Sequence, residues 1–151
     1  MNDAETSPKL MLPALQPFYD AVIPLTWPLV RIACGLNLIV HGWGKVTRGP
    51  AAMAPVFAKM GFEPAYWVVV LLLIVEFVGG ICISIGLLTR FWAAAVAIEM
   101  GVITFGVYWP TGFSWLNRGY EYTLMWGLLS FAIALRGGGP YSVDRRLGRE
   151  L

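Results

Sequence analysis

Three charged side chains, Arg31, Glu76 and Glu99, each interrupt a long apolar stretch of this sequence. A lone charge in the middle of a membrane-spanning helix disfavours insertion by about 2.5 to 3.5 kcal/mol, so these side chains are expected to pair with one another. One guanidinium can reach both carboxylates, or it can hold one as an ion pair while the second keeps its proton. The sequence therefore predicts one buried polar core of Arg31, Glu76 and Glu99, which either sets the rotation of the helices or takes part in function.

Helical periodicity predicts a polar stripe along the first apolar stretch, because successive residues turn by about 100°. The stripe consists of Arg31, Cys34, Asn37, His41 and Lys45. His41 and Lys45 fall at the level of Glu121, which begins the last apolar stretch, so we expect an outer site of His41, Lys45 and Glu121. In that site His41 and Glu121, with Trp43, contact a quinone or exchange protons. The alternative is an interfacial imidazole that only forms hydrogen bonds.

The second apolar stretch carries Glu76, Gly80 and Ser84 at intervals of four residues. A helix places the acid and the two small residues on one side. Small residues allow two helices to approach closely, so we expect this side to face another helix.

The composition is that of a membrane protein. Of the 151 residues, 58% are hydrophobic and 13% are charged, whereas charged residues make up about a quarter of ordinary globular proteins. The mean hydropathy is +0.66. Seven tryptophans suit a protein that is anchored at two bilayer interfaces, and a net charge of +2 is too small to indicate a nucleic-acid surface.

Four stretches are predicted to form membrane-spanning helices, each of which needs about 20 residues to cross about 30 Å of hydrocarbon. They cover about residues 21–41, 66–88, 91–109 and 120–136. The fourth is short, because its uncharged part, residues 122–135, rises only about 21 Å as a helix. The predicted fold is an all-α, membrane-embedded four-helix bundle over residues 21–136. Apolar residues at helical spacing in 50–60 predict an interfacial helix in the first external loop.

The two ends of the chain are expected to lie in the cytoplasm. Residues 1–20 lack the basic start and apolar segment of a secretory signal and are expected to form an N-terminal arm. Residues 137–151 are expected to form a basic tail with a short helix capped by Ser142, lying on anionic headgroups. Six basic residues lie on the side of both termini and of a tight turn at Thr89 and Arg90, against four on the other side. The positive-inside rule therefore favours cytoplasmic termini.

Cofactor and nucleophile motifs are not evident in the sequence. Cys34 and Cys82 differ in expected depth by about 9 Å, which is too far for a disulfide, so both are expected to be packing residues. His41 is the single histidine, and the spacing of ligand residues indicates neither a metal site nor an intrinsic cofactor. A phosphate-binding glycine loop and a serine nucleophile motif are also lacking.

Several short motifs follow one another between about Leu25 and Asp144. They are Arg31-Ile-Ala-Cys-Gly-Leu, His41-Gly-Trp-Gly-Lys45, Glu76-Phe-Val-Gly-Gly80, Gly86-Leu-Leu-Thr-Arg90, Tyr120-Glu121 and Gly-Gly-Gly-Pro-Tyr-Ser142-Val-Asp144. In this order and spacing they resemble the DoxX family of small four-helix membrane proteins. The resemblance implies an association with redox systems of the cytoplasmic membrane, including a subunit of thiosulfate:quinone oxidoreductase, or an accessory role in a larger enzyme.

We therefore expect a DoxX-like inner-membrane protein that serves as a non-catalytic or accessory subunit of a membrane redox complex. Apart from the two thiols, the chain has no residue that can itself be a redox centre. The alternative is a quinone-linked oxidoreductase subunit of the thiosulfate:quinone type, in which quinone is bound by His41, Glu121 and Trp43. Transport of a small anion or a proton is a third interpretation and requires several chains around a pathway. The expected partners are the lipid bilayer and either partner subunits or copies of the chain, and not nucleic acid.

Overall fold

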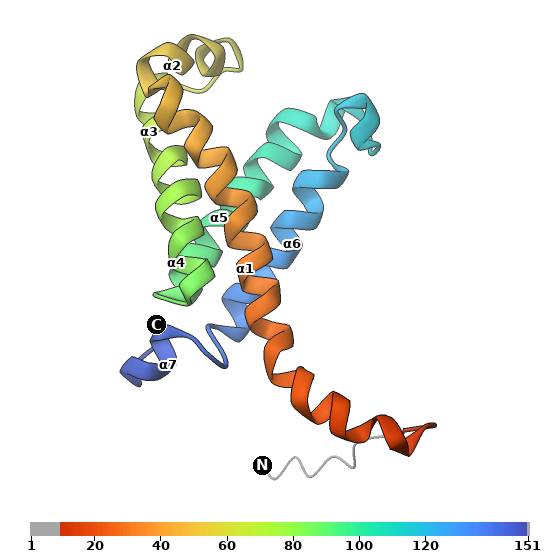
Figure 1. The fold of residues 1–151 in the computed structure, drawn as a ribbon. Helices are drawn as coiled ribbons and strands as arrows, with labels where there is room; N and C mark the ends of the chain where they lie inside the picture. The colour runs from red at the N-terminus through yellow and green to blue at the C-terminus, as the bar shows by residue number, and fades with distance from the viewer. Residues whose placement is uncertain (1–9, 151) are drawn as a thin grey trace.

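The computed structural model describes residues 10–150, and helices dominate this part of the chain (Figure 1). A short 3₁₀ turn, η1, precedes the long helix α1. The second apolar stretch is divided by a π-helical turn, η2, and the third ends in a π-helical turn, η3, and a 3₁₀ turn, η4. The elements are η1 (Pro13–Leu15), α1 (Gln16–Arg48), α2 (Pro50–Lys59), α3 (Ala65–Leu73), η2 (Ile74–Val78), α4 (Gly79–Ile85), α5 (Thr89–Val102), η3 (Ile103–Tyr108), η4 (Trp109–Thr111), η5 (Trp115–Asn117), α6 (Glu121–Arg136) and α7 (Val143–Leu147). Residues 10–150 contain no strand, which confirms the all-α class.

Within the described residues, three helices are long and apolar enough to cross a membrane. They are Pro13–Arg48, Ala65–Ile85 and Thr89–Thr111, and they confirm the first three predicted stretches as continuous helices. The α-helical part of the first, α1, begins at Gln16 rather than at residue 21, so the end of the predicted arm is helical. Residues 1–9 and Leu151, which belong to the predicted arm and tail, lie outside the described residues. The fourth predicted stretch forms α6, whose 16 residues rise about 24 Å.

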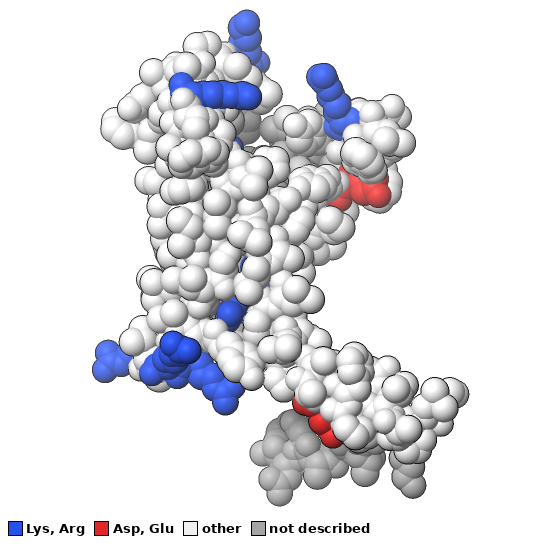
Figure 2. All heavy atoms as spheres, viewed as in Figure 1, with Lys and Arg blue, Asp and Glu red and all other residues white. Residues whose placement is uncertain are grey.

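The helices form two groups that diverge toward one end (Figure 1). α1 packs along α3 and α4, and α5 packs along α6. The helix α2 and the connection between α5 and α6 lie at the open end, whereas α7 lies at the opposite end. Figure 2 shows that the charged atoms gather at these two ends and leave the middle nearly uncharged. An uncharged, apolar middle is what a protein surrounded by hydrocarbon presents.

Glycines let α1 and α4 approach closely. A Cβ atom on Gly80 would lie 2.8 Å from the carbonyl oxygen of Gly35 and 3.0 Å from the side chain of Ile39. Ser84 lies against Gly35 in the same contact. The prediction that one side of the second stretch faces another helix is therefore confirmed, and the facing helix is α1.

The turn between α4 and α5 lies three residues before the predicted position. Gly86 has a φ of +75° and ends α4, with the Leu87 N–H donating to the carbonyl of Cys82 at 2.8 Å. Thr89 and Arg90, predicted to form the turn, are instead the first two residues of α5. The helix can begin there because the Asp144 carboxylate accepts the Leu88 and Thr89 N–H groups.

Candidate functional site

Three charged side chains meet near the open end of the bundle, and we call them the outer triad: Lys45, Glu76 and Glu99. Lys45 of α1 forms a buried ion pair with Glu76, which lies in the π-helical turn η2. Glu99 of α5 lies close enough to both to interact with their charges. Its side chain is buried, and neither carboxylate oxygen has a hydrogen-bond partner among residues 10–150. The outer triad therefore contains one ion pair and one carboxyl group that accepts no hydrogen bond from residues 10–150 and lies within hydrogen-bonding reach of the Glu76 carboxyl group.

The prediction of a single core of Arg31, Glu76 and Glu99 is wrong, because Arg31 is not the cation that pairs with the carboxyl groups. Arg31 is 1% exposed, and its guanidinium donates to the carbonyl of Gly138 and, at 3.4 Å, to that of Tyr141. Lys45 takes the place expected for Arg31. The two cations are 14 residues apart on α1, which corresponds to about 21 Å of helix, so each is satisfied by the acceptors at its own end.

Arg31 belongs to a second polar group, which we call the inner clamp: Arg31, Thr89, Gly138, Ser142 and Asp144. The Asp144 carboxylate accepts hydrogen bonds from the Leu88 N–H at 2.7 Å, the Thr89 N–H at 2.9 Å and the Thr89 hydroxyl at 2.7 Å. It is also close enough to Arg31 to attract its charge. A carboxylate at the N-terminus of α5 is favourable because it accepts N–H groups that have no partner within the helix.

The inner clamp adds contacts with the bundle that were not predicted for the tail. Ser142 and Asp144 are 1% and 2% exposed and are packed against the helix ends, and contact of the short basic helix with lipid headgroups stays a prediction. The indole N–H of Trp27 donates to the carbonyl of Gly137 at 2.9 Å and fixes the start of the tail. The predicted cap is confirmed, since the Ser142 hydroxyl accepts the Arg145 N–H at 3.1 Å. The tail binds the bundle because it supplies the acceptors that α5 and Arg31 need.

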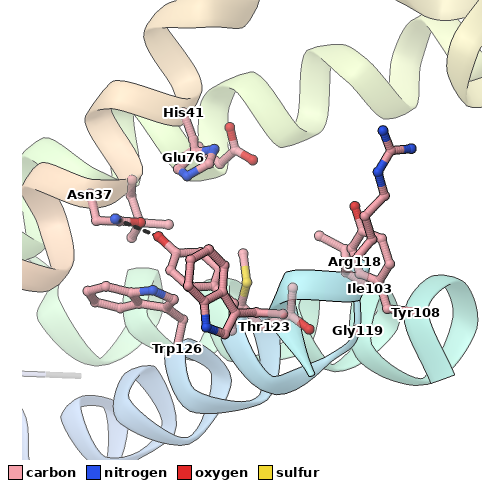
Figure 3. A pocket seen from close by; sticks show the side chains of 13 residues that line it. Asn37, His41, Glu76, Ile103, Tyr108, Arg118, Gly119, Thr123 and Trp126 are labelled. Atoms are coloured by element: carbon pink, nitrogen blue, oxygen red, sulfur yellow. Dashed lines mark hydrogen bonds between the residues drawn. The ribbon is translucent and has the colours of Figure 1, made fainter. Parts of the chain in front are cut away.

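A cavity of about 500 Å³ opens between α1, η2, η3 and α6, and we call it the outer pocket (Figure 3). His41 and Glu76 lie on one wall, and Thr123 and Trp126 lie on the α6 side. Arg118 extends away from the other labelled side chains. The complete lining is Asn37, Leu38, His41, Glu76, Met100, Ile103, Tyr108, Trp115, Arg118, Gly119, Tyr122, Thr123 and Trp126. Most of the wall is apolar or aromatic, with a few polar groups, as is typical of small-molecule sites.

Hydrogen-bonding groups gather on the α1 and α6 sides of the outer pocket. The Asn37 amide donates to the Tyr122 hydroxyl at 2.7 Å, and the centroid of the His41 ring lies 6.5 Å from that of Tyr122. The Trp126 indole nitrogen is buried and has no hydrogen-bond partner in the described part of the chain. The wall of the outer pocket therefore contains a buried, unpartnered N–H donor close to a histidine and a tyrosine.

The predicted outer site of His41, Lys45 and Glu121, with Trp43, is brought together only in part. His41 lines the outer pocket, and Lys45 is linked to it through Glu76. Glu121 does not line it, because its carboxylate accepts the Trp115 N–H at 3.2 Å in the preceding loop. Trp43 packs on Phe77 with ring centroids 5.9 Å apart. Two residues along a helix turn a side chain about 160° away, which directs Trp43 away from His41.

The aromatic half of the outer pocket was not predicted from the sequence. Tyr122 and Trp126 are one helical turn apart on α6 and both line the cavity. The sequence pattern that could have identified Tyr122 and Trp126 is their spacing of four residues, which places both side chains on one face of a helix. Apart from Trp43, the tryptophans were expected to act as anchors at the membrane interfaces.

Two π-helical turns shape this region. Glu76 lies within η2, and Ile103 and Tyr108 of η3 line the outer pocket. A π-helical turn holds an extra residue, so the side chains that follow it are rotated relative to a regular helix, and such turns are frequent at functional sites. A constant 100° per residue cannot predict this rotation.

The two cysteines are buried free thiols on α1 and α4, as predicted for packing residues. The sulfur of Cys34 lies 3.6 Å from the Ser130 hydroxyl.

Comparisons with known proteins agree with this architecture. The family model described as DoxX matches residues 26–109. The chain is 32% identical over 124 residues to the protein named inner membrane protein YqjF of Escherichia coli (strain K12). That alignment covers 81% of this chain and 92% of the relative. No solved structure matches the chain.

Proposed function

Because the chain belongs to the DoxX family of membrane proteins, we propose that it is an accessory subunit of an inner-membrane redox complex and binds a quinone head group in the outer pocket. The relative named as an inner membrane protein supports this location. The observation that carries the quinone assignment is the unpartnered Trp126 N–H, close to His41 and Tyr122 in the wall of a mostly apolar and aromatic cavity.

The proposed topology has four crossings. α6 forms the fourth, α2 lies in the membrane interface outside, and both termini are cytoplasmic, with residues 21–136 as the embedded domain. The position of α7 at the end opposite α2 supports it (Figure 1). Green fluorescent protein fused after Leu151 should fluoresce, and alkaline phosphatase inserted in the loop of residues 112–118 should be active. An active phosphatase after Leu151 would show that α6 does not cross.

The outer pocket suits a quinone head group by its size and its polar groups. Its volume of about 500 Å³ lies in the range of about 300 to 1,000 Å³ found for small-molecule sites. The two carbonyl oxygens of a quinone accept hydrogen bonds, and Trp126 and His41 can each donate one. Displacement of bulk water by an apolar wall strengthens these hydrogen bonds.

The residues of this chain would hold protons rather than electrons. A bound quinone supplies two-electron chemistry, and its reduction consumes two protons. His41 lines the outer pocket and is the side chain from which a proton can be donated, and the Glu76 carboxylate, which is paired with Lys45, can accept a proton there. The electrons are assigned to a partner subunit, because Cys34 and Cys82 are buried on different helices. Purification in mild detergent should yield a complex with a flavin- or haem-containing protein, and a pure homo-oligomer would contradict the accessory role.

Removing the free indole donor should weaken quinone binding. Trp126→Phe keeps an aromatic ring but has no N–H, and it is expected to raise the Kd for decylubiquinone by about tenfold, as one lost hydrogen bond of about 1.4 kcal/mol implies. His41→Ala should have an effect of the same direction. Isothermal titration calorimetry in detergent measures both.

The matched control is Trp43→Phe, since Trp43 packs on Phe77 and does not line the outer pocket. Its Kd should equal that of the wild type. If folded Trp126→Phe and His41→Ala proteins both bind decylubiquinone as tightly as the wild type, the quinone assignment is wrong.

A further inference from the structure

Glu99 is one of the residues that line a second cavity, which we call the lateral groove. It has a volume of about 520 Å³ and lies between α3 and η2 on one side and α5 and η3 on the other. Phe57 and Met60, at the end of α2, and Phe62 close it at the open end of the bundle. Its remaining wall is almost entirely apolar. The lateral groove shares Ile103 and Tyr108 with the outer pocket, and the residues Glu76 and Glu99 line one cavity each.

Glu99 is the polar group of the lateral groove that has no partner. It is 7% exposed, and both of its oxygens are without a hydrogen-bond donor among residues 10–150. The ammonium group of Lys45 forms its ion pair with Glu76 and not with Glu99. The outer triad is therefore neutral while Glu99 holds its proton, and it has a net charge of −1 once Glu99 is ionised. A buried carboxylate without compensation is unfavourable, so a ligand that brings a positive charge would be stabilised there.

The rim of the lateral groove would be in contact with lipid. Leu71 of α3 and Ile98 of α5 line it and are largely exposed. Both residues lie within the apolar helices that are long enough to cross a membrane. A ligand would therefore enter from the hydrocarbon, which requires apolar groups around its charge.

We propose that the lateral groove binds a membrane-soluble organic cation, whose positive centre pairs with Glu99 and whose apolar groups contact α3, α5 and Phe62. The charged groups that face Glu99 are Glu76 from η2 and Lys45 from α1, and Tyr108 from η3 lines the same cavity. The cation therefore meets an apolar wall and one carboxyl group, which becomes its counter-charge by releasing its proton. This site is separate from the quinone assignment and does not depend on it.

Tetraphenylphosphonium is a suitable probe because it is a large apolar cation with no hydrogen-bond donor. The full-length protein in detergent should bind it saturably in equilibrium dialysis, with protein-free micelles as the blank. Tetraphenylborate has nearly the same shape and the opposite charge, so it should not bind to the protein. Equal binding of the two ions would show hydrophobic partition alone and would overturn the proposal.

Two variants test the position of the site. Glu99→Gln should weaken tetraphenylphosphonium binding at least tenfold, because the negative charge is lost. Val102→Trp, which fills the groove from α5 and leaves the outer triad unchanged, should have a similar effect. Its matched control is Val40→Trp, on an exposed position of α1 that lines neither cavity, and it should bind like the wild type.

The folded state of each variant is checked by thermal unfolding in the same detergent. If Glu99→Gln does not fold, Val102→Trp still tests the groove. Wild-type affinity in both folded variants would overturn the proposal. Loss of tetraphenylphosphonium binding in Glu99→Gln with unchanged decylubiquinone binding would separate this site from the outer pocket.

Discussion

Replacing Lys45 with methionine is expected to lower the free energy of unfolding by about 3 to 5 kcal/mol, because removing one partner of a buried ion pair leaves a buried charge without compensation. Lys45 is buried, and its ammonium group is the cation of the outer triad. In the variant, Glu76 and Glu99 would face each other with no positive charge between them. Methionine keeps the length and the apolar stem of the side chain, so the decrease in the free energy of unfolding results from loss of the positive charge. Denaturant titration in detergent, followed by circular dichroism, measures it.

A double variant separates the lost ion pair from a general defect. Lys45→Met combined with Glu76→Gln removes both charges and should recover most of the stability. Lys59→Met is the control, because Lys59 is exposed at the end of α2 and should change stability little. An undiminished stability of Lys45→Met, or an equal loss in Lys59→Met, would show that the ion pair with Glu76 does not stabilise the bundle.

The second large effect is expected at Asp144. Its carboxylate accepts three hydrogen bonds from Leu88 and Thr89 and lies near the buried guanidinium of Arg31. Hydrogen bonds to a charged group contribute about 1.5 to 3 kcal/mol each and are not additive, so Asp144→Ala should lower the free energy of unfolding by about 3 kcal/mol or more. The tail should also detach, and amide hydrogen exchange at Leu88 and Thr89 should become faster.

Glu150→Gln is the comparison within the same tail. Glu150 pairs with Arg90 at 3.1 Å with both side chains partly exposed, and exposed pairs contribute at most about 1 kcal/mol. Its stability should therefore remain close to that of the wild type, and exchange at Leu88 and Thr89 should not change. If Asp144→Ala protects these two amides as well as the wild type does, another group caps α5 and the inner clamp is wrongly assigned.

The helical segments could be predicted because they depend on local properties of the chain. Hydropathy located α3, η2 and α4 together as residues 66–88, and the structure has them at 65–85. The end of α6 followed from the glycines after Arg136, and the start of α7 from Ser142. Each of these depends on residues within one or two helical turns.

The sequence predicted which types of residue form the candidate site, but it did not predict which charged side chains pair with one another. Glu76 and Glu99 were correctly expected to be buried together near one cation, but that cation is Lys45 rather than Arg31. Arg31 and Lys45 are about 21 Å apart along α1, so the error lies in the expected position of α1 relative to the helices that carry the two carboxyl groups. Glu121 was expected to face His41, yet a backbone N–H of the preceding loop is nearer to its carboxylate. Loop conformation is not encoded in helical periodicity.

By itself the sequence determined that the chain is helical and apolar, which residues are charged within the apolar stretches, and which sides of the helices are polar or small. Those properties follow from side-chain chemistry and a repeat of 3.6 residues per turn. Only the tertiary structure decided that Arg31 holds the tail, that Lys45 holds Glu76 and that Glu99 is left without a partner. The physical reason is that a buried charge is satisfied by whichever acceptor or counter-charge lies within hydrogen-bonding distance. That distance depends on the π-helical turns, on the close approach of α1 to α4 and on the return of residues 137–144 to the bundle.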